Sequence, residues 1–321
     1  MGIAPYSKNQ KMKKQEFKKL IREEIKNFIE EADVFGQTTA IPLSKIDAKA
    51  AKAALSAGTK DGNDKDDSAA TDASFPFPVG ELKPMQKEVI PDKALAFALG
   101  FLRDGIPDLS NMEAIVSSDG YIMDGHHRWA AHTLINPAAQ VQVAKIDMPA
   151  DDLITTLNIY TKAKGLKGNP GRGDVTKFAS SIPKLLTIAM AKGTAGLPDD
   201  KGHWPVVSAE EVKTLLGKVP GANGDAKKGM KIMAANAKKL PTQKHPNAPS
   251  RVDMPVIDAA KGDLKKVLAK ISSGEMDIKE PFSNSVSSLL KTKGDEDKER
   301  KEGDKEVNEL KRWKKLAGII K

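Results

Sequence analysis

Large hydrophobic residues recur at helical spacing near the start of the chain, between residues 12 and 32. They lie three and four residues apart, at Phe17, Leu20, Ile21, Ile25, Phe28 and Ile29. Lys and Glu residues occupy the opposite face, so the pattern predicts an amphipathic helix within an N-terminal segment, 1–33. Because that polar face carries both charges, packing against a core or a partner helix is favoured over attachment to an anionic membrane.

The next stretch is polar and of low complexity. Residues 48–74 read AKAAKAALSAGTKDGNDKDDSAATDAS, and no large apolar residue follows Leu55. Such a composition buries too little apolar surface to offset the entropy lost on ordering the chain. We therefore expect 34–77 to be a linker that is largely disordered.

Strand and helix patterns alternate only between 78 and 165. We expect helices at 95–102, 128–134 and 151–164, strands at 114–116, 121–123 and 141–146, and a hairpin turn at 118–120. Beyond 165 the pattern predicts a helical C-terminal region, 166–288, with helices at 174–192, 208–217, 225–239 and 257–272. A charged helical tail, 289–321, has apolar residues at helical spacing: Leu310, Trp313, Leu316 and Ile319. The chain is therefore expected to be α+β, with a small mixed sheet and mostly α-helical flanks.

Composition narrows the picture. The 321 residues are 39% hydrophobic, 5% aromatic and 30% charged, which suggests one compact core of about 90 residues. The 52 Lys and Arg residues outnumber 43 Asp and Glu residues, and a net charge of +9 favours a polyanionic partner such as nucleic acid. The absence of cysteine excludes disulfides, thiolate metal sites and a cysteine nucleophile. With no signal peptide and no long apolar run, we expect a cytoplasmic protein without a membrane partner.

The densest chemistry lies in residues 122–134, IMDGHHRWAAHTL, between an apolar strand and an Ala-rich helix. Gly125 allows a tight turn, and the unpaired N–H groups of the first helical turn form a natural anion site. Arg128 is placed to hold a phosphate bidentately, and His126 and His127 supply neutral or charged donors. Asp124 can cap the helix, fix a histidine tautomer or hold a cation bound to phosphates. These residue types together predict an oxyanion pocket.

Simpler interpretations apply to single residues of this segment. Asp124 can be an ordinary N-cap, and Trp129 is better explained as a core residue than as a stacking platform. Adjacent side chains at a helix start point in different directions, which disfavours a metal site made by His126 and His127. His132 lies five residues after His127, so these two do not share a helical face.

The run YIMDGHHRWAA, with ELKPMQKEV upstream, resembles the signature of the ParB/sulfiredoxin superfamily, over residues 79–165. It is most similar to the free serine kinase branch, whose members carry an Asp-Gly-His-His-Arg run. The resemblance implies a ParB/sulfiredoxin-like mixed-sheet domain at 78–165 that binds ATP or another nucleotide with Mg²⁺. Gly125, His126, His127 and Arg128 would contact the phosphates, and Asp124 would be catalytic and hold the metal. Many phage and plasmid proteins carry this arrangement, so a phage protein, in the host cytoplasm or the virion, is expected.

Departures from the family are specific. The cysteine of sulfiredoxins is absent, so sulfinic acid reduction is excluded. The chromosome-partitioning branch has an Arg-Arg pair where this chain has His126 and His127, and no convincing helix-turn-helix pattern stands immediately after residue 165. Gln86 stands where the serine kinases have the glutamate base, and an amide cannot accept a proton at neutral pH. Glu88 would share a face with Gln86 in an extended segment and is our candidate for the catalytic base.

Three functions remain open at this point. The first is a nucleotide-binding protein with phosphotransferase or NTPase activity, using Glu88 and Asp124. The second is a non-catalytic ParB-like DNA-binding module, because nine Lys against three acidic residues in 201–250 would add non-specific affinity. The third is a virion structural or assembly component, whose terminal helices contact a protein partner.

Overall fold

The description covers most of the chain between residues 40 and 278. The structure is a computed structural model that describes residues 40–60, 67–105, 112–197, 207–258, 261–276 and 278. The amphipathic helix expected at 12–32 and the charged tail expected at 289–321 lie outside the described residues. No described helix combines the length and apolar character needed to cross a membrane.

A five-stranded mixed sheet forms the centre of the described residues, in the order β1-β5-β3-β4-β2. β1 and β5 are antiparallel, as are β3 and β4, whereas β3 with β5 and β2 with β4 are parallel. Together with the surrounding helices this confirms the expected α+β class. The strands are β1 (Thr71–Pro78), β2 (Lys83–Pro84), β3 (Ile115–Val116), β4 (Tyr121–Asp124) and β5 (Gln140–Ile146).

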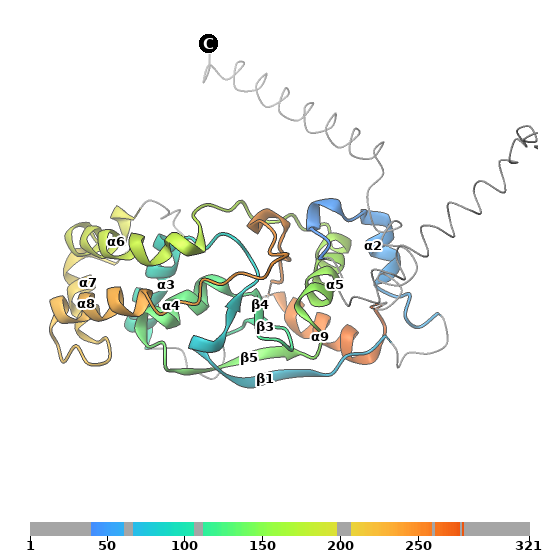
Figure 1. The fold of residues 1–321 in the computed structure, drawn as a ribbon, viewed down its shortest axis with the longest axis horizontal. Helices are drawn as coiled ribbons and strands as arrows, with labels where there is room; N and C mark the ends of the chain where they lie inside the picture. Colours follow the sequence, from blue (N-terminus) through green and yellow to red (C-terminus); the bar gives the residue numbers. More distant parts are fainter. Residues whose placement is uncertain are drawn as a thin grey trace, which may run out of the picture. The chain divides into compact units, whose positions relative to one another are not determined.

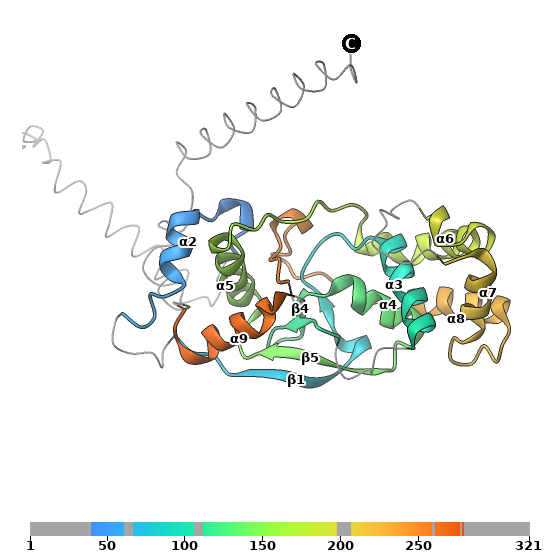
Figure 2. The same ribbon diagram turned by 180° about the vertical axis from the view of Figure 1, so that it is seen from behind.

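Helices cover both faces of this sheet (Figures 1 and 2). One side carries α3 and α4, against which α6, α7 and α8 pack, and the other carries α5, α2 and α9. The α-helices are α2 (Ala48–Ala54), α3 (Pro91–Asp104), α4 (His126–Ile135), α5 (Ala150–Ala163), α6 (Phe178–Lys192), α7 (Ala209–Gly217), α8 (Ala226–Ala237) and α9 (Asp263–Ser273). Short 3-10 helices lie at η1 (Leu43–Lys45), η2 (Val79–Glu81), η3 (Val175–Lys177), η4 (Thr194–Gly196) and η5 (Arg251–Asp253).

Alternating side chains of the strands feed two hydrophobic cores. Ile122 of β4 belongs to the core beneath α3 and α4, whereas the next residue, Met123, belongs to the core beneath α5 and α9. Val143 and Ala144 of β5 divide in the same way. Since successive strand residues point to opposite faces, the centre of the sheet is buried on both sides.

The expectation of a disordered linker over 34–77 is wrong for the part that the structure describes. Residues 48–54 form α2, whose N-cap Asp47 accepts hydrogen bonds from the backbone of Lys49 and Ala50. Alanine is the best helix former, and its small side chain lets α2 bury Ala51 and Ala54 against α5. The low-complexity composition suggests disorder because it lacks large apolar residues. Packing through alanines does not need them.

The second half of the supposed linker ends in β1, an edge strand paired with β5. Phe75 lies opposite Val143 and Phe77 opposite Val141. This strand contains two prolines, and an edge strand tolerates residues that cannot donate to the ladder. β2 was also missed, because two residues show no periodicity.

Four helices were expected after residue 165 and are observed, although α6 begins at Phe178 and α9 at Asp263, later than the expected 174 and 257. They were not expected as part of the main core. One cluster of buried residues joins Val79 and Trp129 to Phe178, Val212 and Leu240. The compact unit is therefore larger than the core of about 90 residues that composition suggested.

Candidate functional site

A tight turn connects β4 to α4 at the motif found in the sequence. Gly125 has φ +98°, in the left-handed region, and is the N-cap position of α4. A Cβ on this glycine would lie 2.7 Å from the Cβ of Ala114 in the neighbouring segment. Both the backbone conformation and the close approach require glycine here. The N-cap is thus Gly125 and not Asp124, and no side chain caps the helix.

The two adjacent histidines accept hydrogen bonds from the backbone of the loop at 85–90, which precedes α3. Nε2 of His126 accepts from the N–H of Met85 at 3.2 Å, and Nε2 of His127 accepts from the N–H of Ile90 at 3.1 Å. Both side chains are buried. In a neutral imidazole one nitrogen accepts and the other donates, so each ring is left with its Nδ1–H.

Burial also keeps these rings uncharged. Desolvation, reinforced by the charge of Arg251, lowers the pKa of His126 to about 3. The same causes lower the pKa of His127 well below its usual value. Of the neutral and charged donors expected here, burial favours the neutral form. They fix the 85–90 loop against α4, and each can offer a ligand only a neutral Nδ1–H.

Arg128 lies in the first turn of α4 and points back toward the end of β4. Its Nη2 donates to the carbonyl oxygen of Glu113 at 2.7 Å and lies 3.6 Å from a carboxylate oxygen of Asp124. Its Nε is buried and has no hydrogen-bond partner. Glu113 adopts φ +50°, which is rare for a residue with a side chain and is characteristic of functional sites.

Asp124, the last residue of β4, brings a carboxylate to the same place. Burial raises its pKa, while Arg128 and the Gly125 N–H act in the opposite direction. About a third (34%) of its side-chain surface remains exposed, so water screens part of these effects.

These residues open into a cavity of about 380 Å³. One wall consists of Asp124, Gly125, His126, His127 and Arg128, the whole predicted motif. A second wall comes from a distant segment, 245–258, which we call the strap; it contributes Arg251 and Met254–Asp258. The remaining lining residues are Gln86, Lys93, Phe97, Glu113, Met123 and Asn169.

Glu88, the expected catalytic base, does not line the cavity. Its carboxylate accepts a hydrogen bond from the backbone N–H of Arg251 at 2.8 Å. The chain bends at 85–87, so Gln86 and Glu88 do not share a face, and Gln86 alone is buried in the cavity wall. The extended geometry on which that assignment depended is absent, and we withdraw Glu88 as the base.

Two other expectations can be compared with the structure. Trp129 is fully buried and donates from its indole N–H to the carbonyl oxygen of Val79 at 3.0 Å, which confirms it as a core residue. Among the described residues no group of three or more His, Cys, Asp or Glu side chains is arranged to hold a metal ion. Mg²⁺ needs only one or two carboxylates when phosphates and water supply the rest, so Asp124 fits such an ion.

No pattern in the sequence indicated the strap. Arg251 and Lys93 stand in segments without periodicity or motif, and only the fold brings them to the predicted turn. The strap is held by polar contacts with α5: Asn158 Nδ2 donates to the carbonyl oxygen of Asp253 at 3.0 Å, and Thr161 Oγ1 accepts from the N–H of Val256 at 3.0 Å. Buried Asn and Thr residues on α5 were the available signal, since buried polar groups need partners.

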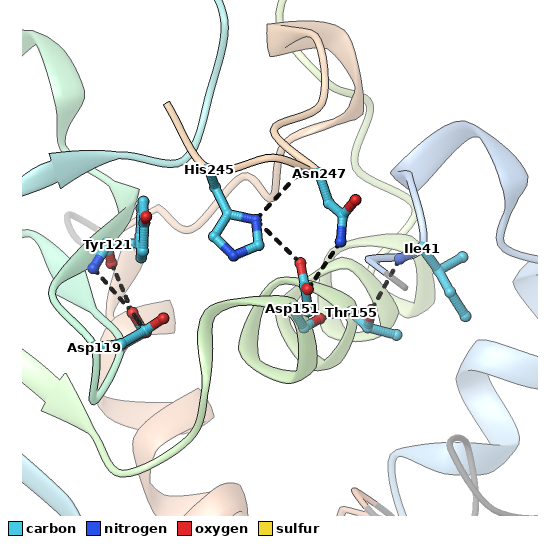
Figure 3. Close-up of polar contacts among 8 residues, drawn as sticks. Ile41, Asp119, Tyr121, Asp151, Thr155, His245 and Asn247 are labelled. Atoms are coloured by element: carbon cyan, nitrogen blue, oxygen red, sulfur yellow. Dashed lines mark hydrogen bonds and ion pairs between the residues drawn. The ribbon is translucent and has the colours of Figure 1, made fainter. Parts of the chain in front are cut away.

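The start of the strap forms a second polar cluster (Figure 3). His245 packs edge-on against Tyr121 of β4, with ring centroids 4.7 Å apart, and its Nδ1 lies 3.4 Å from Asp151 of α5. Asn247 donates from its side chain to the same carboxylate at 2.9 Å. Burial raises the pKa of Asp151, and the bond from Asn247 opposes that shift. This cluster anchors the strap to both β4 and α5.

Comparisons with known protein families, curated proteins and solved structures found no match to this chain.

Proposed function

We propose that this protein binds the phosphate groups of a nucleotide in the cavity at the N-terminus of α4. The observation that carries the proposal is the convergence of an uncapped helix N-terminus and Arg128 on one cavity. The first-turn N–H groups and the helix dipole favour an anion, and a guanidinium supplies charge-assisted hydrogen bonds. Lys93 and Arg251 line the same space and add to its positive charge.

The rest of the cavity suits the other parts of a nucleotide. Phe97, Met123 and the strap residues from Met254 to Ile257 provide an apolar wall beside the charged one. Ligand sites usually combine such walls with a few polar groups and occupy about 300–1,000 Å³. The likeness of the DGHHR turn to the ParB/sulfiredoxin superfamily supports the same ligand class. Mg²⁺ held by Asp124 would offset phosphate charge when bound.

Catalysis by this cavity is a separate question, because phosphotransfer to a hydroxyl acceptor needs a proton acceptor. Gln86 lines the cavity and stands at the sequence position where the serine kinases that the motif resembles have a glutamate, and an amide cannot accept the proton. Glu88 faces Arg251 instead. We therefore propose a binding protein without robust kinase activity. Formation of ADP from ATP, with and without serine, tests this; turnover that survives Asp124→Asn and Gln86→Ala would require a different catalytic site.

A thermal-shift screen of nucleoside mono-, di- and triphosphates with Mg²⁺ tests binding. A ligand present at a hundredfold excess over its dissociation constant stabilises the folded state by about 2.7 kcal/mol. We expect such stabilisation in the parent protein and its loss in Arg128→Ala, since a bond to a charged group contributes about 1.5–3 kcal/mol.

Arg172→Ala is the matched control. Arg172 forms an ion pair with Asp92 at 2.7 Å but does not line the cavity, so this variant should keep the full nucleotide response. An Arg128→Ala protein that folds and responds like the parent would contradict the proposal.

Exposed lysines on α8 favour DNA binding as the second candidate function. They lie on the solvent side of one helix and just after it: Lys227, Lys228, Lys231, Lys238 and Lys239. A basic face of this kind binds phosphates without sequence preference, and the affinity falls steeply with salt. Replacing three of these lysines by Gln should weaken DNA binding and leave nucleotide-dependent stabilisation intact. DNA binding that is independent of salt and of these lysines would exclude this surface.

A further inference from the structure

Arg251 occupies a built position in the cavity, although it is far from Arg128 in the sequence. Its backbone N–H donates to the carboxylate of Glu88 at 2.8 Å, and its Nη1 donates to the carbonyl oxygen of Pro170 at 2.8 Å. Glu88 therefore holds the backbone of Arg251, and the segment at Pro170 orients its guanidinium before any ligand arrives.

Two glycines allow the loop at 168–171 to lie directly against this part of the strap. A Cβ on Gly171 would lie 2.8 Å from the Cβ of Arg251 and 3.1 Å from Cδ of Glu88. A Cβ on Gly168 would lie 1.8 Å from the carbonyl oxygen of Val252. Loop, Glu88 and strap thus form one close-packed support, and a side chain at either glycine would displace it.

The charge of Arg251 acts at the floor of the cavity, where the phosphate is proposed to lie. Burial lowers the pKa of both His126 and His127 and raises that of Asp124; the charge of Arg251 adds to the first effect and opposes the second. Arg128 acts on Asp124 and His127 as well, so the two guanidinium groups influence one small region from different walls.

We propose that Arg251 binds a second phosphoryl group, so that the cavity selects a diphosphate or triphosphate chain over a single phosphate. This inference depends on the proposed function. A guanidinium fork matches one phosphate at a time, so Arg128 and the α4 N-terminus serve the first group and Arg251 the next. Glu88 is the positioning residue that holds the backbone of Arg251 in place.

Calorimetric titrations of the full chain with inorganic phosphate and with pyrophosphate, both in EDTA, test the inference. The parent protein should bind pyrophosphate at least tenfold more tightly than phosphate, a ratio equal to about 1.4 kcal/mol. Arg251→Gln should abolish this preference by weakening pyrophosphate binding about tenfold more than phosphate binding, while its backbone bond to Glu88 is kept. Arg128→Ala should weaken both ligands.

Two substitutions of Glu88, measured in the same titrations, provide a second test. Glu88→Gln keeps a carbonyl oxygen for the Arg251 N–H and should preserve the pyrophosphate preference, whereas Glu88→Ala should reduce it with little change in phosphate affinity. A purely structural role for Glu88 would change both affinities alike and would contradict the assignment.

The outcomes separate the two proposals. If the parent binds both anions and Arg251→Gln keeps the preference for pyrophosphate, the role of Arg251 is wrong and the phosphate site stands. If the parent binds neither pyrophosphate nor phosphate, nor any nucleotide, both proposals fail. Arg172→Ala should match the parent in every titration, and a change there would show that bulk charge, not the cavity, sets the affinities.

Discussion

The two walls of the cavity are built in different ways. The turn at 124–128 is continuous with the core: its helix contains Trp129, Ala130 and Ala131, all fully buried. The strap lacks helix or strand apart from one short 3-10 turn, and hydrogen bonds from α5 and Glu88 hold it in place. One wall is therefore fixed mainly by hydrophobic packing, whereas the other adds polar contacts to the buried side chains of Met254 and Ile257.

This difference predicts which substitutions change the stability of the whole fold and which change only the strap. Losing a core side chain affects the whole fold, whereas losing one polar contact of the strap loosens a single segment. Substitutions in the turn should therefore change global unfolding, and substitutions that release the strap should act locally.

The largest effect is expected at the packed wall. Trp129→Ala removes a fully buried indole and the bond to the Val79 carbonyl, and should lower the free energy of unfolding by about 3–5 kcal/mol. Val252→Ala, at an exposed strap position (48%), should change it by less than about 0.5 kcal/mol. Urea unfolding of both variants measures the contrast, and equal effects would contradict it.

A change of pH tests the neutral histidines of α4. His132 is buried and stacks on Phe101, and burial, with Arg128, lowers its pKa to about 4. Between this value and about 6.5, its pKa when unfolded, the unfolded chain binds more protons, so the free energy of unfolding falls as the pH decreases. At pH 5 the loss from His132 is about 2 kcal/mol relative to neutral pH.

Unfolding of the parent and of His132→Gln between pH 7 and pH 5 measures this. The parent should lose stability toward low pH, and the variant should lose about 2 kcal/mol less. Equal slopes for the two proteins would show that His132 takes up its proton over the same pH range in the folded and the unfolded protein.

A smaller and local effect is expected at the strap. Thr161→Val keeps the side-chain shape but removes the hydroxyl bonded to the N–H of Val256, at a cost of about 1 kcal/mol. Hydrogen exchange should accelerate at 250–258 and remain unchanged in α4. Thr187→Val, which removes an exposed hydroxyl bonded to Pro183, is the control, and faster exchange throughout the variant protein would contradict a locally held strap.

The same contrast explains what could be predicted from sequence. The turn at 122–134 was found because glycine, histidines and arginine stand together between a strand and a helix, so local spacing carries the information. Arg251 and Lys93 reach the cavity only through the fold, and nothing in their neighbouring residues indicates it. Glu88 was misassigned because its role depends on a bend at 85–87 and on a partner far along the chain.

Prediction of the fold from the sequence has the same limit. The α+β class and the helices with regular apolar spacing were predicted, because periodicity reports burial directly. α2 and β1 were missed because one packs through alanines and the other is an edge strand containing prolines. Their stability depends on α5 and β5, which pattern alone cannot pair with them.

Ligand-induced changes in backbone amide resonances test the central claim, that the α4 turn holds the phosphate, most directly. Titration of the ¹⁵N-labelled full chain with Mg²⁺ and ATP should shift the amides of Gly125, His126, His127 and Arg128 most strongly, with Arg251 next. The Arg128→Ala protein should lose these shifts. If the largest shifts instead lie around Arg172 and Ser180, or over the exposed lysines of α8, while residues 125–128 stay unmoved, the phosphate site is not at this turn.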